Sequence, residues 1–161
     1  MSRKGFTLLE LLVVIAIIGL LSTFAVVSLN SGRAKARDSR RIADAKAVQQ
    51  AMEFIFDDNG DYDLIACTDT VIPIEIATCD HTALGEYIPN LAQMTDPKSG
   101  TTLDCDGSRT ATCDISFRTL PTGSATTYNV YFYLEEANDA YNTTGAADCT
   151  MTPGSIVCVT N

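Results

Sequence analysis

The feature that most constrains this chain is an apolar run that extends from Phe6 to Leu29 and follows a short basic head. As a helix, this run of about 24 residues would be about 36 Å long, because each residue adds about 1.5 Å. That length is enough to cross the hydrocarbon core of a bilayer, which is roughly 30 Å thick. Glu10 is the one charged residue in the run, and its carboxylate costs free energy in an apolar setting unless a partner neutralises it.

The segment Gly5–Glu10 reads GFTLLE and leads into the apolar stretch LLVVIAIIG. Together they resemble the class III signal of type IV pilins and type II secretion pseudopilins. The resemblance implies that a prepilin peptidase cuts after Gly5 and methylates the amine of Phe6. It also implies that Glu10 meets the Phe6 amine of a neighbouring subunit in a filament, with Phe6 one helical turn from Glu10. We expect no nearby side chain of the same chain to pair with Glu10, since Lys4 leaves with the leader and the next base is Arg33.

Two simpler interpretations of the N-terminus compete with this one. An ordinary secretory signal also has a basic head and an apolar core, and Ala34-Lys35-Ala36 offers an A-x-A-like cleavage site. Its core is usually about 7–15 residues, however, which is shorter than this run. A plain single-span anchor is the other alternative, in which Glu10 lies at a helix start, where the helix dipole favours a negative charge.

Charge is segregated along the chain. The formal net charge is −9, so a nucleic-acid partner held by a basic surface is not expected. Most of the bases fall in one short stretch after the apolar run, which indicates either a solvated helix face or a basic belt near lipid head groups or acidic neighbours. Such a belt opposes the positive-inside rule if the C-terminal part is outside, and we give the N-terminal motif more weight than the charge count. The bases of this stretch are Arg33, Lys35, Arg37, Arg40, Arg41 and Lys46.

All six cysteines lie in the C-terminal part of the chain. An even set confined to one region indicates disulfides and an oxidising, extracytoplasmic setting, and the absence of a C-x-x-C pair disfavours zinc or thioredoxin-like chemistry. A C-terminal disulfide loop resembles that of many pilins, and short loops are predicted throughout, although six cysteines allow many other connectivities. The predicted pairs are Cys149 with Cys158, Cys105 with Cys113, and Cys67 with Cys79 as the remaining pair.

The helix is predicted to continue without interruption from Phe6 to Asp57, because no proline intervenes. Apolar residues recur at intervals of three and four in its second half, which makes that half amphipathic. These residues are Ile42, Ala45, Val48, Met52 and Ile55. Asn59-Gly60 is predicted to end the helix.

Alternating oxygens around this helix end form a weak calcium candidate, made of Asp57, Asn59, Asp61 and Asp63. The EF-hand pattern is not matched, so a solvated helix stop is favoured and no cofactor is expected.

Three later segments alternate or are rich in strand-forming residues, which predicts a small antiparallel sheet on the apolar side of the helix. They are 115–119, 128–134 and 155–159. Residues 71–76 are predicted to form an extended edge, and residues 84–91 a short helical turn. The expected fold is α+β, the pilin fold: a long N-terminal helix, transmembrane and then amphipathic, on a disulfide-stabilised antiparallel sheet. The expected organisation is a leader at 1–5, a transmembrane or filament-core helix at 6–30, and a head with a variable loop region at 31–161.

No catalytic motif is present, and His81 is the single histidine, so the chain is not expected to be an enzyme. A membrane-tethered enzyme remains the alternative from another class. The resemblance implies a structural subunit of a type IV pilus-like filament, with identical subunits, prepilin peptidase, membrane lipid and an inner-membrane assembly platform as partners. The major pseudopilin of a type II secretion system is the alternative, and a competence pseudopilin is the minor one. The expected location is the inner membrane with the head extracytoplasmic, followed by an extracellular or periplasmic filament.

Overall fold

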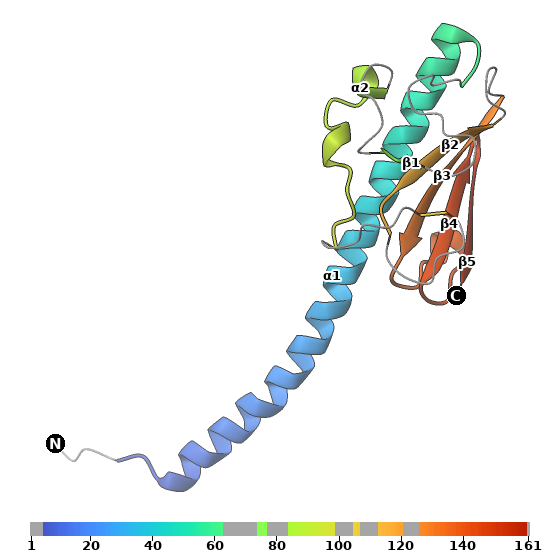
Figure 1. Ribbon diagram of the computed structural model, residues 1–161. Coiled ribbons are helices and arrows are strands. Elements are labelled where there is room, and N and C mark those ends of the chain that lie inside the picture. Colours follow the sequence, from blue (N-terminus) through green and yellow to red (C-terminus); the bar gives the residue numbers. More distant parts are fainter. Residues whose placement is uncertain are drawn as a thin grey trace. The chain divides into compact units, whose positions relative to one another are not determined.

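The computed structural model describes residues 5–62, 74–76, 84–98, 105–106, 113–120 and 126–160. The chain divides into two compact units, Met1–Ala34 and Lys35–Asn161. The helix α1 (Leu8–Asn59) accounts for most of the described first unit and continues into the second (Figure 1). The prediction of one long helix is confirmed, with both ends two residues later than expected.

Glycine chemistry ends α1 as predicted. Gly60 has a positive φ of 81°, and its N–H donates to the carbonyl of Phe56 at 2.8 Å. This conformation is easy for glycine and costly for residues with a Cβ, which is why helices so often stop at such a residue.

The second unit contains a five-stranded antiparallel sheet in the order β1-β2-β3-β4-β5. The strands are β1 (Ile74–Glu75), β2 (Ser116–Leu120), β3 (Thr127–Leu134), β4 (Ala147–Thr152) and β5 (Ser155–Thr160), and the 3-10 turn η3 (Asp139–Tyr141) lies between β3 and β4. The predicted number of three strands was too low. The missed strand β4 pairs on both sides, with β3 and β5, so its place in the sheet is fixed by its neighbours although its own sequence contains few strand-forming residues.

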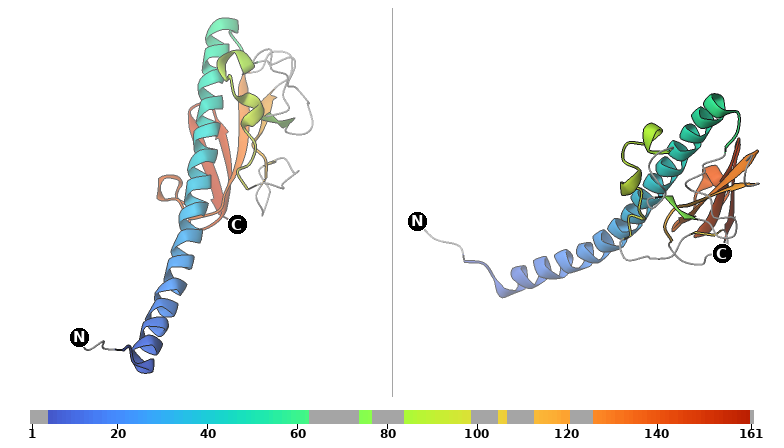
Figure 2. Two further views of the ribbon diagram at one scale, coloured as in Figure 1. Left: turned by 90° about the vertical axis from the view of Figure 1, so that its left-hand side faces the viewer. Right: turned by 45° about the horizontal axis from the view of Figure 1, so that its top comes forward.

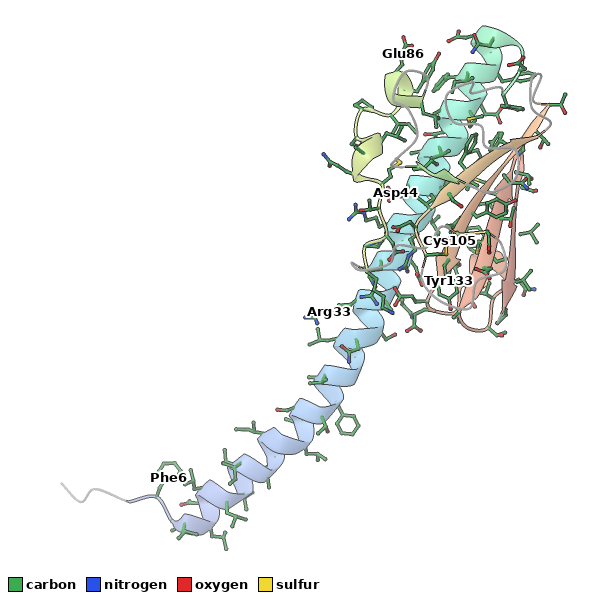
Figure 3. The ribbon with its side chains drawn as sticks, in the orientation of Figure 1. Phe6, Arg33, Asp44, Glu86, Cys105 and Tyr133 are labelled. Atoms are coloured by element: carbon green, nitrogen blue, oxygen red, sulfur yellow. A yellow bond between two sulfur atoms is a disulfide. The ribbon has the colours of Figure 1, made fainter. Side chains whose placement is uncertain are left out.

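Strand β3 is buried on both faces of the sheet, and its side chains alternate between them. One face joins a hydrophobic core with α1, and its β3 residues are Tyr128, Val130, Phe132 and Leu134. The opposite face carries Tyr131 and Tyr133, which pack with Cys105 and Cys113 in a second, smaller cluster (Figure 3). The alternation predicted for residues 128–134 is therefore confirmed.

Within the second unit, residues 35–59 of α1 run between the sheet and the segment that carries α2 (Leu84–Tyr87) and η2 (Leu91–Gln93), as Figure 1 and Figure 2 show. The core includes the predicted apolar face of the helix, with Val48 and Met52 fully buried. Leu84 and Leu91 from the α2–η2 segment join the same core. Helix and sheet thus share one continuous apolar interior, as the α+β prediction requires.

Two disulfides are present in the described residues, and both were predicted. Cys105 bonds Cys113, and Cys149 on β4 bonds Cys158, its direct partner on β5. The predicted pair of Cys67 and Cys79 lies outside the described residues, as do residues 71–73 of the predicted extended edge at 71–76, whereas Ile74 and Glu75 form β1. Both bridges lie in the second unit and stabilise it.

Candidate functional site

The predicted cleavage site lies in a non-helical segment ahead of α1. Gly5, Phe6 and Thr7 precede the first helical residue, Leu8. The side chain of Phe6 is 86% exposed. An exposed peptide outside regular structure is the form of backbone that a peptidase can bind. Phe6 therefore does not share a helical turn with Glu10 as expected, because the helix starts two residues later.

Glu10 is held by Thr7 in a reciprocal cap at the start of α1. The carboxylate accepts hydrogen bonds from the Thr7 backbone N–H at 2.9 Å and from its hydroxyl at 2.8 Å. The Glu10 backbone N–H in turn donates to the Thr7 hydroxyl oxygen at 3.2 Å. This is the capping-box arrangement, which satisfies backbone donors that have no partner within the helix.

The expectation that the chain offers Glu10 no nearby side-chain partner was therefore wrong for hydrogen bonds. The reason is the position of the N-cap at Thr7, which brings a hydroxyl to the carboxylate. The spelling T-x-x-E before an apolar run was a signal in the sequence that predicts this cap. Thr7 is neutral, however, so the negative charge of Glu10 still has no counter-charge among the residues that cap it.

The apolar part of α1 is exposed along its described length. One 18-residue window of the helix has a mean hydropathy of 2.7 and no buried residue, so the helix is long and apolar enough to cross a membrane. Leu8 is 82% exposed and Phe24 is 69% exposed. A contiguous apolar surface of this extent is unfavourable in water and indicates a lipid or protein environment.

The hydroxyl groups in this apolar stretch are satisfied by the helix itself. Ser22 donates to the carbonyl of Ile18, and Thr23 donates to the carbonyl of Leu20, each at 2.7 Å. Such bonds remove the need for water at these side chains. The stretch can therefore lie in an apolar environment without leaving these two hydroxyls unpaired.

The second unit contains a buried ionic network that sequence reasoning missed. Arg41 on α1 makes a bidentate pair with Asp96 at 2.7 and 2.9 Å, and it also donates to Asp38 at 2.7 Å and to Glu135 at 2.8 Å. Its side chain is only 4% exposed. Arg37 forms a second bidentate pair with Glu135, at 2.7 and 2.8 Å. Bidentate guanidinium–carboxylate pairs combine two charge-assisted hydrogen bonds and fix the relative orientation of the groups.

Backbone hydrogen bonds complete the network. The Asp38 carboxylate accepts the N–H groups of Glu135 and Glu136, each at 3.0 Å, at the end of β3. The Asp96 carboxylate accepts the N–H of Lys98 at 2.8 Å. The helix is thereby fastened to two loops that are distant in the sequence.

The network also changes the pKa values of Glu135 and Arg41. The hydrogen bond from Arg37 is the largest cause that lowers the pKa of Glu135, and with Arg41 it brings this pKa to about 2. Burial alone lowers the pKa of Arg41, but its bonds to Asp96 and Glu135 outweigh burial and raise it. These groups therefore remain ionised across the physiological range.

The basic side chains after the apolar run fall into two groups, those paired with carboxylates of the second unit and those exposed to solvent. Arg41 is buried and Arg37 is paired with Glu135, so neither belongs to a solvated face or a lipid-facing belt. Both lie on the side of α1 that faces the head, which a helical projection of the core residues already indicates. The side chains of Arg33, Lys35, Arg40 and Lys46 are exposed.

The weak calcium candidate falls at the end of α1. Asp57 and Asn59 lie in its last turn, Asp61 follows it, and Asp63 lies outside the described residues. Within the described part of the chain, no group of three acidic, histidine or cysteine side chains is placed to hold a metal ion. His81 also lies outside the described residues.

Comparison with protein families gives a match at the N-terminus. Residues 1–26 match the family model described as the prokaryotic N-terminal methylation motif. The motif includes the predicted cleavage site, Phe6 and Glu10. No solved structure matches the chain significantly.

Curated relatives fall into two groups. The type II secretion system core protein G of Escherichia coli (strain K12) is 38% identical over 61 residues, which are 38% of this chain and 42% of that protein. The corresponding protein of Vibrio cholerae gives the same identity and coverage. A fimbrial protein of Pseudomonas aeruginosa is 30% identical over 100 residues, which are 62% of this chain and 64% of that protein. The matches span less than half of the secretion proteins and less than two thirds of the fimbrial protein. The resemblance to type IV pilins and type II secretion pseudopilins is confirmed.

Proposed function

We propose that the chain is a structural subunit of a type IV pilus-like filament. It is inserted in the inner membrane as a precursor, cleaved after Gly5 by a prepilin peptidase, and methylated on the amine of Phe6. Processed subunits then leave the membrane at an assembly platform and pack through their apolar helices. The observation that carries the proposal is the exposed apolar part of α1, preceded by the methylation motif.

The apolar surface explains both membrane insertion and assembly. Removing a Leu, Ile or Val side chain from water contributes about 1.5–3 kcal/mol, so this stretch requires lipid or protein around it. Helices of identical subunits offer the same apolar environment as lipid, and the exchange between them is nearly neutral. The charge of Glu10 then decides between lipid and filament, because its carboxylate reaches a low free energy only when a cation faces it.

The amine of Phe6 is the cation that the proposal assigns to Glu10. Cleavage after Gly5 creates this amine, and an axial offset between stacked subunits brings it beside Glu10 of a neighbour. The Thr7 cap supports this role, since it holds the carboxylate at the helix start. Misregistered subunits would leave both charges in an apolar setting, so the pair sets the register.

The head is proposed to be extracytoplasmic. Disulfides form and persist in oxidising compartments, and both described disulfides lie in the second unit. The chain is proposed to need no cofactor and, with its net charge of −9, to have no nucleic-acid partner.

A second candidate is the major pseudopilin of a type II secretion system, favoured by the 38% identity to core protein G of Escherichia coli. The longer alignment with a fimbrial protein favours the pilus. A competence pseudopilin stays the minor alternative. A deletion strain separates the first two: loss of long surface filaments supports the pilus, whereas a secretion defect in cells without surface filaments supports the pseudopilin.

Intact mass of sheared filament subunits tests the processing. The mass should correspond to residues 6–161 with one added methyl group. A mature chain that begins at Arg37 would instead establish the secretory-signal alternative and refute the proposal.

The effect of Glu10 on assembly is tested with a matched control. Glu10→Ala should be processed and inserted normally but should give few filaments, because removal of one partner of a buried charge pair costs about 3–5 kcal/mol. Glu10→Asp should be intermediate, since it keeps the charge and loses reach. Thr7→Val removes the capping hydroxyl but keeps the charge, and should cost only about 0.5–2 kcal/mol. Filament yields lowered equally by Glu10→Ala and Thr7→Val would show that the cap matters and the charge does not, and a normal yield from Glu10→Ala would show that the charge is not needed for assembly.

A further inference from the structure

The C-terminal end of α1 and the adjacent α2 turn carry an aromatic and acidic surface, here called the end patch: Phe54, Asp57, Asp58 and Tyr87. Phe54 is 59% exposed and stacks on Tyr87 with ring centroids 5.9 Å apart. The Tyr87 hydroxyl donates a hydrogen bond to the Asp58 carboxylate. Glu86 of the same α2 turn lies beside this end of α1 (Figure 3). The Phe54–Tyr87 stack and the Tyr87–Asp58 hydrogen bond are therefore already formed in the single chain.

The acids of the end patch oppose the electrostatics of the helix. The C-terminal end of a helix is the negative end of its dipole, where bases are favourable and acids are not. The last turn of α1 contains no base. Among the described residues, none of the ion pairs involves Asp57, Asp58 or Glu86. Acids at the negative end of a helix dipole, with no base of the same chain beside them, are expected where a surface binds a partner.

Complementary charges lie lower on the same helix. Lys35 and Lys46 are exposed and, within the described part of the chain, neither takes part in an ion pair. Eleven residues separate them, which is about three helical turns, so they share one face. Asp57 is about 16 Å from Lys46 along the axis and about 33 Å from Lys35. Both distances exceed the Debye length of about 8 Å, so one chain does not neutralise its own patch.

We propose that the end patch binds the exposed lysines, Lys35 and Lys46, of a second copy of this chain. This inference rests on the filament function proposed above and names the head contact of that filament. The Phe54 and Tyr87 rings receive the lysine stem and ammonium, and Asp57 and Asp58 pair with the charge. Because the two surfaces differ, the contact is head-to-tail, and such contacts generate open helical filaments when the rotation does not close a ring.

Other occupants fit the end patch less well. A divalent cation needs several oxygen ligands that converge, and no such group of three exists in the described residues. Anionic lipid head groups would be repelled by the carboxylates. A lysine side chain matches the combination of open aromatic rings and separate carboxylates.

Charge reversal in the full chain tests the contact. The patch variant carries Asp57→Lys and Asp58→Lys, the lysine variant carries Lys35→Glu and Lys46→Glu, and a third chain carries all four changes. Val159→Lys is the control for an added positive charge, because Val159 is 64% exposed on β5 and lines neither the end patch nor the hollows beside Lys35 and Lys46. The readout is the yield of sheared filaments relative to processed subunit in the membrane.

Each double variant should lower the yield by about ten-fold, since one exposed pair changes association by up to about five-fold and two pairs are reversed. The four-fold variant should recover most of the wild-type yield, and Val159→Lys should leave it unchanged. Asp57→Asn, which preserves the shape of the side chain, should lower the yield by about two-fold even if a reversal variant fails to fold.

Double variants with wild-type yield, or a four-fold variant no better than the doubles, would overturn the contact. Wild-type cells without filaments would refute the proposed function itself, whereas intact filaments that are insensitive to these charges would refute only this contact.

Discussion

Arg41→Met provides a sharp test of how the head is held on α1. The substitution keeps an unbranched apolar stem that suits a helix, and removes the guanidinium that joins Asp96, Asp38 and Glu135. The Asp96 side chain is 1% exposed, so its carboxylate would lose a bidentate partner without gaining water.

The expected loss of folding free energy depends on which hydrogen bonds Asp96 and Asp38 keep after the substitution. Breaking a buried ion pair by removing one partner costs about 3–5 kcal/mol. Asp96 keeps the Lys98 N–H, and Asp38 keeps the N–H groups of Glu135 and Glu136, so we expect the lower end, about 3 kcal/mol. Arg41→Lys should be intermediate, since lysine keeps the charge but cannot form the bidentate pair.

Arg40→Met is the matched control, because it makes the same change one residue earlier on an exposed side chain. The Arg40 side chain is 51% exposed and lies 3.7 Å from Asp44. An exposed pair of this kind contributes about 0–1 kcal/mol. The comparison therefore contrasts a buried arginine that joins three carboxylates with an exposed one that has one ion pair and one hydrogen bond to the Gln93 carbonyl.

Urea unfolding of the full chain in detergent measures both variants. All six tyrosines lie after residue 60, so near-ultraviolet circular dichroism reports the head. With a slope of about 2 kcal/mol per molar urea, Arg41→Met should lower the midpoint by about 1.5 M and Arg40→Met by less than about 0.5 M. Equal shifts for the two variants would refute the view that this network is buried and stabilising.

Three further outcomes are expected from the same unfolding assay. Glu135 has a pKa lowered from 4.5 to about 2, so its ionised form stabilises the fold above pH 4.5 and this contribution is lost as the pH falls towards 2; the difference between wild type and Glu135→Gln should shrink over that interval. Replacing Cys149 and Cys158 together by serine should cost about 2.5 kcal/mol, because the bridge closes a short loop, and a cost near zero would contradict this. Met52→Ala should cost about 2–5 kcal/mol, since this fully buried side chain leaves a cavity, whereas Gln50→Ala at a nearby exposed position of α1 should cost far less.

Elements with a local pattern could be predicted from the sequence. The helix follows from the apolar run and the later spacing of Val48, Met52 and Ile55, and β3 follows from its strict alternation. Strand β4 was missed because Ala147 and Asp148 are poor strand formers, and its position depends on hydrogen bonds with strands on both sides.

The ionic network shows the limit of the same reasoning. Arg41 lies 55 residues from Asp96 and 94 residues from Glu135, and no spacing rule relates residues at such distances. Its position four residues before Ala45, on the apolar face, was a partial signal that it is buried. The Thr7 cap, in contrast, could have been predicted from the T-x-x-E pattern of the sequence.

The order of the strands has a consequence for how a subunit matures. From β2 to β5, every strand pairs with the next one along the chain, so the sheet has mainly local contacts and a small loop-closure entropy. Such a sheet can form hairpin by hairpin in the order of the chain. Cys158 lies opposite Cys149 only when β5 is in register with β4, so closure of that disulfide fixes the register of the last hairpin.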